Sequence, residues 1–270
     1  MARKHWRGEK SGRARPRSGG FSAGGRSRAS SSLDNAAILY GWHTVKAALE
    51  NPARRIRKIW TTDNAARRLA EEGIALPFPP ELVRPGTIDA RLGPDAVHQG
   101  LLAEADPLEA PALEELAADG LVLVLDQITD PHNVGAIMRS AAAFAARAIV
   151  TTARHSPEAT GVLAKAASGA LELVPLISVQ NLARGMEALR ARGFMLVGLD
   201  GAAERDLAEV PLTSAIALVL GAEGKGLRQL TKTTCDALAR IELPGAIKSL
   251  NVSNAAALAL YVASRRRQKS

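Results

Sequence analysis

The sequence predicts an α/β protein in which a parallel sheet is covered by helices on both faces. The first observation behind this is a regular alternation of apolar runs and helical stretches after Gly120. The second is that runs such as Leu121–Ile128 and Ala215–Ala222 are almost continuously apolar, which is typical of strands buried on both faces. The third is that 47% of the 270 residues are hydrophobic, enough for one large or two small domains.

Residues 34–106 predict a small mixed α/β domain. A helix over Trp42–Glu50 should end at Asn51-Pro52, because the residue before a proline disfavours helical geometry. A second helix over Asn64–Glu72 should end at Gly73. The expected strands of this domain are Ile56–Thr62 and Val97–Ala105.

Residues 107–119, rich in proline, acids and alanine, predict a linker with a helical turn or two, and residues 120–270 form the larger domain. Ligands of parallel sheets bind beyond the carboxyl ends of strands. We therefore expect three loops to form one site, namely Gln127–Gly135, Gly221–Gly226 and Pro244–Asn251. The expected strands are Leu121–Ile128, Ala148–Thr152, Leu173–Val179, Phe194–Asp200, Ala215–Ala222 and Ala239–Leu243, and the expected helices are Val134–Ala146, Pro157–Ser168, Asn181–Arg192 and Leu227–Cys235.

The net charge of +8 is concentrated at the N-terminus. Residues 1–33 hold nine Lys or Arg and one acid, so the other 26 bases and 26 acids leave residues 34–270 neutral. A Gly/Ser/Arg segment with few apolar residues cannot offset its ordering entropy, so this basic tail should be disordered. It either adds salt-dependent attraction to phosphate backbones or only solubilises the protein.

Composition excludes several classes of protein. Cys235 is the only cysteine, so no internal disulfide forms, which is typical of the reducing cytoplasm. No apolar run approaches the roughly 20 residues of a membrane helix, and the N-terminus lacks the apolar core of a signal peptide. The five histidines are scattered without zinc-ligand spacing, and Gly-x-Ser-x-Gly is absent. We expect a cytoplasmic protein without metal or membrane.

The first loop combines a helix start with an isolated cation. Asp130-Pro131 begins a turn, Asn133 is a candidate cap for the following helix, and Gly135 permits close approach to its first turn. Arg139 follows among small apolar residues. Such an arginine is either paired structurally or directed at an anion.

The other two loops add polar groups to glycines. Gly221–Gly226 matches neither the dinucleotide nor the P-loop pattern, and its simplest interpretation is an ordinary strand-to-helix turn. Glu223 within it is placed to hold Arg139 or a backbone amide. Ser249 and Asn251 precede an alanine-rich helix together with Ser253. One helix cap explains only one of these three residues, so the others indicate a ligand.

Together the three loops resemble the signature motifs of the SpoU/TrmH-type (SPOUT superfamily) RNA 2′-O-ribose methyltransferases. The similarity covers about residues 36–265, and the subgroup resembled is the one that methylates guanosine in 23S ribosomal RNA. The motifs that carry it are Asn133-x-Gly135-x-x-x-Arg139, Leu220–Leu227 and Ile241–Ala256, and residues 40–45 and 98–100 resemble the opening and closing motifs of an L30e-like RNA-binding domain.

The resemblance implies an α/β trefoil knot in the C-terminal domain, a homodimer, and S-adenosyl-L-methionine (SAM) bound in the knot. One departure is that the family's Ile-Pro-Met is replaced here by residues 241–243, with proline two places later. By position, the residues that would bind the cofactor are Gly221, Ile241, Leu243 and Leu250, and the catalytic set would be Asn133, Arg139, Glu223, Ser249 and Asn251.

The predicted function is therefore SAM-dependent methylation of a ribose 2′-hydroxyl in large-subunit ribosomal RNA. A transfer RNA substrate is one alternative, and a non-catalytic RNA-binding or ribosome-assembly factor on the same fold is another. Guanidinium stays protonated in proteins. We therefore expect Arg139 to bind a phosphate and stabilise the developing alkoxide, with Glu223 fixing Arg139 while Ser249 and Asn251 orient the ribose.

Overall fold

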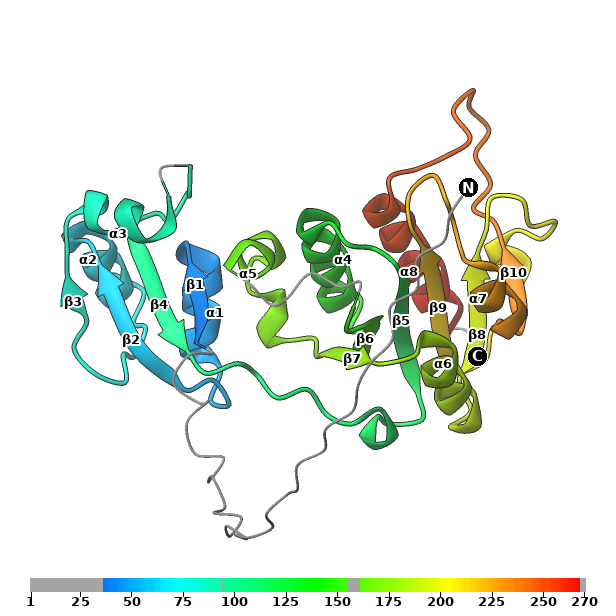
Figure 1. Ribbon diagram of the computed structural model, residues 1–270, viewed down its shortest axis with the longest axis horizontal. Coiled ribbons are helices and arrows are strands. Elements are labelled where there is room, and N and C mark those ends of the chain that lie inside the picture. The colour runs from blue at the N-terminus through cyan, green and yellow to red at the C-terminus, as the bar shows by residue number, and fades with distance from the viewer. Residues whose placement is uncertain (1–35, 94, 155–160, 268–270) are drawn as a thin grey trace, which may run out of the picture. The chain divides into compact units, whose positions relative to one another are not determined.

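The computed structural model describes residues 36–93, 95–154, 161–267, which form two sheets with their helices (Figure 1). The predicted disordered basic tail lies outside the described residues, as does the first part of the helix expected over Pro157–Ser168. Among the described residues, no helix is long and apolar enough to cross a membrane.

The N-terminal domain is a mixed four-stranded sheet in the order β1-β4-β2-β3. Alternate residues of its strands point to opposite faces. Ile59 therefore packs in the core with α1 and α2, whereas the next residue, Trp60, packs with Ile88 of α3. The elements are β1 (Ala37–Tyr40), α1 (Trp42–Glu50), β2 (Ile56–Thr61), α2 (Asp63–Glu71), β3 (Glu81–Leu82), α3 (Pro85–Leu92) and β4 (Leu101–Ala105).

The C-terminal domain is a six-stranded, wholly parallel sheet in the order β10-β8-β9-β5-β6-β7. The seven residues of β5 are all buried, as its continuous apolar run predicts. The elements are η1 (Leu113–Glu115), β5 (Gly120–Asp126), α4 (Pro131–Ala143), β6 (Ala148–Thr152), α5 (Gly161–Ala167), η2 (Ala170–Glu172), β7 (Leu176–Val179), α6 (Leu182–Ala191), β8 (Met195–Leu199), η3 (Leu207–Glu209), β9 (Ala215–Gly221), α7 (Gln229–Thr234), β10 (Ala237–Ala239) and α8 (Val252–Arg267).

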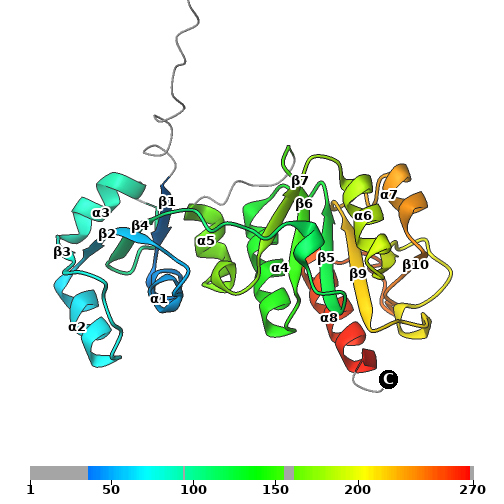
Figure 2. The ribbon, with the colours of Figure 1, turned by 90° about the horizontal axis from the view of Figure 1, so that it is seen from below.

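Helices cover both faces of this sheet, as predicted. Leu121 and Leu123 face the core formed with α4, α5 and α8, and Val122 faces the core formed with η1 and α6. Figure 2 shows α4 and α8 on one side of the sheet and α6 and α7 on the other. Sequence reasoning therefore predicted the layers of the C-terminal domain correctly.

The last strand differs from its prediction. A strand was expected over Ala239–Leu243, but β10 ends at Ala239. β10 is an edge strand that pairs only with β8, where Ala239 lies opposite Leu199 at the end of that strand. Past the end of β8 the backbone changes partner: the Arg240 N–H donates to the Arg205 carbonyl oxygen, and the Arg240 carbonyl oxygen accepts from the Leu207 N–H. Residues 241–251 then form the loop that leads to α8.

Candidate active site

The strand order brings two of the three predicted loops together. β5 and β9 are adjacent and parallel, and their last residues, Asp126 and Gly221, lie opposite each other. The segments that follow β5 and β9 therefore leave the sheet at the same edge. The loop before α4 and the glycine loop after β9 lie side by side for this reason.

The carboxylate of Glu223 links all three loops in one hydrogen-bonded cluster. Its Oε1 accepts from the amide Nδ2 of Asn251 at 2.5 Å, from the Asn133 amide at 3.5 Å and from the Val252 backbone N–H at 3.1 Å. The Asn251 amide also donates to Asn133 Oδ1 at 2.9 Å. Residues 118 positions apart are thus joined directly, and we call Asn133, Glu223 and Asn251 the amide–carboxylate cluster.

Helix caps place two members of the cluster. Asn251 Oδ1 accepts from the backbone N–H of Ser253 at 2.9 Å and from its hydroxyl at 2.5 Å, which satisfies donors at the start of α8. For α4 the expected cap was wrong. Asp130 is the N-cap and accepts from the His132 N–H, so Asn133 lies inside the first turn with its side chain free to reach the cluster.

The glycine loop needs its glycines for different reasons. A Cβ on Gly221 would lie 2.1 Å from the backbone carbon of Gly226, because the loop folds back onto itself there. Gly226 has a φ of +64°, in the left-handed region that favours glycine. The close approach at Gly221 and the positive φ at Gly226 lie within six residues of each other. Together they turn the chain so that Glu223 faces Asn133 and Asn251.

A buried carboxylate holds the far end of this loop. The Asp126 side chain is wholly buried and accepts from the Arg228 backbone N–H at 3.1 Å and from its Nε at 2.7 Å. Sequence reasoning did not single out either residue. The available signal was the acid Asp126 within an apolar strand, since a buried charge requires a partner.

Two of the four residues expected to bind the cofactor adjoin the cluster in sequence, since Gly221 lies two residues before Glu223 and Leu250 directly precedes Asn251. Gly221, Ile241 and Leu243 are half-buried, whereas Leu250 is exposed. Apolar side chains and backbone amides of this kind are chemically suited to the faces and edge of an adenine. Lys248 donates to the Leu243 carbonyl oxygen at 2.8 Å, which bridges the loop between them.

The structure explains the departure from the family's third motif. The Glu242 backbone N–H, which proline would lack, donates to Asp206 Oδ2 at 2.8 Å. The Glu242 carboxylate pairs with Arg240 at 2.9 Å. The path of the chain before Leu243 is therefore fixed here by polar contacts in place of a rigid proline.

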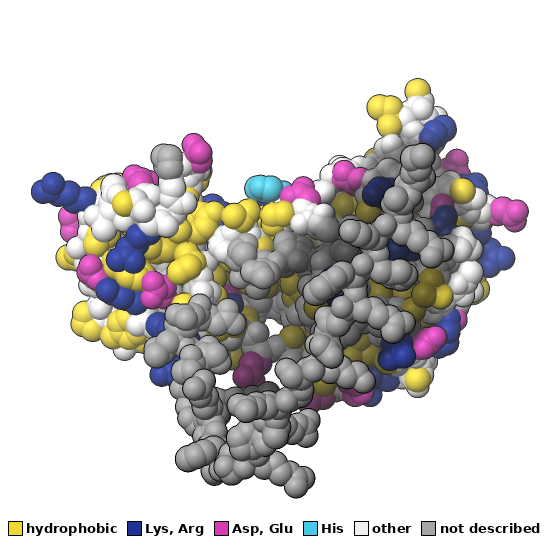
Figure 3. All heavy atoms as spheres, in the orientation of Figure 1, with side chains coloured by type: hydrophobic (Ala, Val, Ile, Leu, Met, Phe, Trp, Pro, Cys, Tyr) yellow, Lys and Arg dark blue, Asp and Glu magenta, His cyan; other side chains and the backbone are white. Residues whose placement is uncertain are grey.

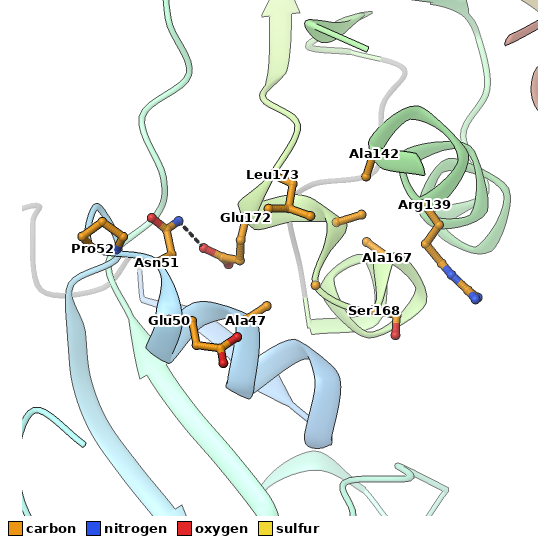
Figure 4. Close-up of a pocket in the computed structure, with 12 residues that line it drawn as sticks. Ala47, Glu50, Asn51, Pro52, Arg139, Ala142, Ala167, Ser168, Glu172 and Leu173 are labelled. Atoms are coloured by element: carbon orange, nitrogen blue, oxygen red, sulfur yellow. Dashed lines mark hydrogen bonds between the residues drawn. The ribbon is translucent and has the colours of Figure 1, made fainter. Parts of the chain in front are cut away.

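Arg139 and Ser249 are not brought into the cluster by hydrogen bonds. Glu223 was expected to hold Arg139, but among the described residues it binds Asn133, Asn251 and the Val252 amide instead. Six residues turn an α-helix by about 240°, so Arg139 lies about 120° around α4 from Asn133. It lines a cavity beside α5 (Figure 4), and Ser249 is exposed in the loop before α8.

Comparison with known proteins identifies the family. Residues 120–261 match the SpoU rRNA methylase family, and residues 38–111 match the substrate-binding domain of RNA 2′-O ribose methyltransferases. The chain belongs to the SpoU rRNA methylase family. It is an RNA 2′-O-methyltransferase.

Two relatives with assigned activities align over most of their own length with this chain. The chain is 38% identical over 241 residues to the 23S rRNA (guanosine-2′-O-)-methyltransferase RlmB of Pseudomonas putida, covering 85% of this chain and 96% of that protein. The protein of the same name from Vibrio cholerae is 39% identical over 245 residues, with 85% and 97% covered.

Solved structures share the arrangement of both domains. The SpoU methyltransferase AviRb from Streptomyces viridochromogenes, crystallised with its cofactor AdoMet, superposes with a TM-score of 0.73 at 25% identity, covering 87% of this chain and 92% of that one. A TrmH-family protein from Porphyromonas gingivalis gives a TM-score of 0.72 at 27% identity, with 86% and 91% covered.

Proposed function

We propose that this protein methylates the 2′-hydroxyl of a guanosine in 23S ribosomal RNA. The observation that carries the proposal is the amide–carboxylate cluster, which joins three motif loops where parallel-sheet enzymes bind ligands. The choice of RNA follows the relatives of Pseudomonas putida and Vibrio cholerae, whose names specify guanosine and 23S rRNA. A cytoplasmic location, where ribosomal RNA is processed in bacteria, belongs to the same proposal.

The cofactor would be held by Gly221, Ile241, Leu243 and Leu250, largely through backbone groups. When bound, SAM supplies an electrophilic methyl group on a positively charged sulfur. The chain's own contribution is to orient the ribose and to exclude water from it. Alignment of the attacking hydroxyl with the methyl group supplies much of the acceleration in such reactions.

Within the proposed catalytic set, the cluster orients and Arg139 stabilises charge. Glu223 holds Asn251 and Asn133 in place, and Asn251 with the exposed Ser249 orients the ribose. As the hydroxyl loses its proton, negative charge develops on its oxygen. The guanidinium of Arg139 stabilises that charge and binds the adjacent phosphate, while phosphate or water receives the proton.

The position of Arg139 supports a homodimer in which a second copy completes the site. Arg139 lines the cavity beside α5, about 120° around α4 from Asn133, and has no hydrogen bond to the described residues of the cluster in its own chain. Helix α8, whose N-terminus carries the cluster, also exposes the apolar side chains of Leu258 and Tyr261, which are 43% and 53% accessible. Burying these side chains against a second copy would remove apolar surface from water.

The finer fold description is part of this proposal. The trefoil knot and the domain limits of 34–106, 107–119 and 120–270 are supported by the family resemblance and by the two sheets. The basic tail, residues 1–33, would add sequence-independent attraction to RNA.

Two experiments test the function. Ribose methylations in total RNA from a strain lacking the gene should miss one guanosine mark in 23S ribosomal RNA, and a missing mark in transfer RNA would overturn the substrate. With purified protein, Arg139→Lys should lose nearly as much activity as Arg139→Ala, because a point charge lacks the planar fork. Arg184→Ala, an exposed α6 variant, is the control. Near-wild-type activity of the lysine variant would remove Arg139 from the mechanism.

A further inference from the structure

A cavity lies where the N-terminal and C-terminal domains meet. It has a volume of about 530 Å³ and is lined by the end of α1, by α4, and by the chain from α5 to η2 (Figure 4). Ligand pockets in proteins have roughly 300–1,000 Å³, so a nucleotide base fits. We call this space the junction cavity.

The wall of the junction cavity is fixed by a buried ion pair. Arg54 and Glu172 have side chains only 2% and 3% exposed, and their charged groups are 2.6 Å apart. Asn51 donates to the same carboxylate at 2.8 Å, and Arg54 also donates to the Asp106 carbonyl oxygen. The polar groups of Asn51, Arg54 and Glu172 therefore have their hydrogen-bond partners within the protein. We assign this wall a structural role.

Close backbone packing further fixes the two domains around the cavity. Gly169 has a φ of +91°, and a Cβ there would lie 2.8 Å from the Ala47 Cβ of α1. Thr44 of α1 donates to the carbonyl oxygen of Ala164 in α5 at 3.2 Å. The cavity is thus held in shape by both domains without a ligand.

Three polar side chains around the cavity keep hydrogen-bonding capacity for a ligand. Within the described part of the chain, Arg139 and the Ser168 hydroxyl have no hydrogen-bond partner. The Glu50 carboxylate lies 3.9 Å from Lys46, whose closer partner is Glu72 at 2.7 Å. Figure 4 shows Glu50 on the α1 side and Arg139 on the α4 side.

Two further features of the lining are typical of a binding site. Ser168 has a φ of +50°, which is uncommon for a residue other than glycine and is often found at functional positions. Leu173 is 73% exposed and lines the same cavity as Ala142. An exposed apolar side chain in a recess offers a surface on which a planar base can lie.

We propose that the junction cavity binds the base of a guanosine next to the methylated nucleotide, with Glu50 as the residue that recognises it. This rests on the proposed function, in which Arg139 holds the phosphate beside the target ribose. Because Arg139 also lines the junction cavity, the nucleotide on the other side of that phosphate is directed into it.

The carboxylate of Glu50 is the reason that we propose guanine as the bound base. Guanine carries two adjacent donors on its Watson–Crick edge, N1–H and the N2 amino group, and an ionised carboxylate has two acceptor oxygens. Adenine, cytosine and uracil each lack such a neighbouring pair of donors. The N-terminal domain, to which Glu50 belongs, has no net charge, because residues 36–106 contain nine basic and nine acidic residues. It has no excess positive charge to attract RNA, so specific contacts matter in this domain. On the face shown in Figure 3, basic and acidic side chains are interspersed among hydrophobic ones.

The first test separates recognition from chemistry. Full-length Glu50→Ala, with transcribed 23S ribosomal RNA as the probe, should raise the KM for RNA roughly tenfold or more, because hydrogen bonds to a charged group are lost. The kcat and the affinity for SAM should stay unchanged. Glu50→Gln should lose nearly as much, since its amide NH₂ would face a donor. Glu71→Ala, an exposed acid of α2, is the matched control.

The second test changes the RNA. Inosine lacks the N2 amino group, so replacing the guanosine adjacent to the mapped target by inosine should raise the KM for wild-type protein. The same replacement should have no effect on Glu50→Ala. A Glu50→Ala protein that matches Glu71→Ala, while wild type methylates the RNA, would overturn this inference alone. A wild-type protein that binds no SAM and methylates no RNA would instead overturn the proposed function.

Discussion

The buried pair between Arg54 and Glu172 gives the sharpest prediction about stability. Among the described residues, Glu172→Ala leaves the buried Arg54 guanidinium with the Asp106 carbonyl oxygen as its one acceptor, and the Asn51 amide also loses its acceptor. Removing one partner of a buried ion pair costs about 3–5 kcal/mol. We therefore expect the free energy of unfolding to fall by about that amount.

Urea unfolding followed by tryptophan fluorescence measures this loss, because Trp42 and Trp60 are buried in the N-terminal domain. The double variant Arg54→Met/Glu172→Met should lose less than Glu172→Ala alone, since apolar replacement of both partners removes the uncompensated charge. Arg147→Ala, which breaks an exposed pair with Asp119, is the control and should cost at most about 1 kcal/mol. If Glu172→Ala is no worse than this control, the pair does not stabilise the junction.

Three more predictions concern the C-terminal domain. Asp126→Asn should raise the KM for SAM several-fold, because Arg228 and the glycine loop lose a charged acceptor; equal loss in Asp119→Asn would contradict this. Gly221→Ala should abolish cofactor binding in calorimetry, since its Cβ would meet backbone at 2.1 Å, and a variant that still binds SAM normally would show that the loop can shift. Burial raises the pKa of the Cys235 thiol to about 12. Native protein should therefore react with iodoacetamide near pH 8 far more slowly than unfolded protein, and stability should fall as the pH rises from about 9 toward 12.

The sequence predicted much of the C-terminal domain because its strands are apolar runs with clear ends. β6 was predicted with its observed limits, and the strands expected over Leu121–Ile128 and Ala215–Ala222 were within two residues of β5 and β9. The order of the strands could not be predicted, since it depends on pairing between residues far apart in the chain. The placement of β5 between β6 and β9 is such a pairing.

The N-terminal domain was predicted less completely. The helix over Trp42–Glu50 has its predicted limits, but β1 and α3 were not predicted. α3 buries only Ile88, so it shows no apolar period from which a helix could be inferred. The strand expected from Val97 begins at Leu101, because Gln99 and Gly100 adopt a positive φ and form a turn before it.

The candidate site was predicted as a set of residues but not as a geometry. The motifs correctly predicted that Asn133, Glu223 and Asn251 lie together. The expectation that Glu223 fixes Arg139 was wrong, because the rotation of α4 places Arg139 about 120° around the helix from Asn133, in the lining of a cavity. Asp126 was missed, because a single acid in an apolar strand does not reveal its partner.

The amide–carboxylate cluster has a consequence for protein synthesis. Its third member, Asn251, comes from the segment that enters α8, whereas its first, Asn133, emerges from the ribosome more than a hundred residues earlier. A nascent chain can complete its central strands and still have no assembled pocket until the final helix docks. The pocket is therefore assembled only after the last helix has been synthesised and has docked, so the cluster forms late in the folding of this domain.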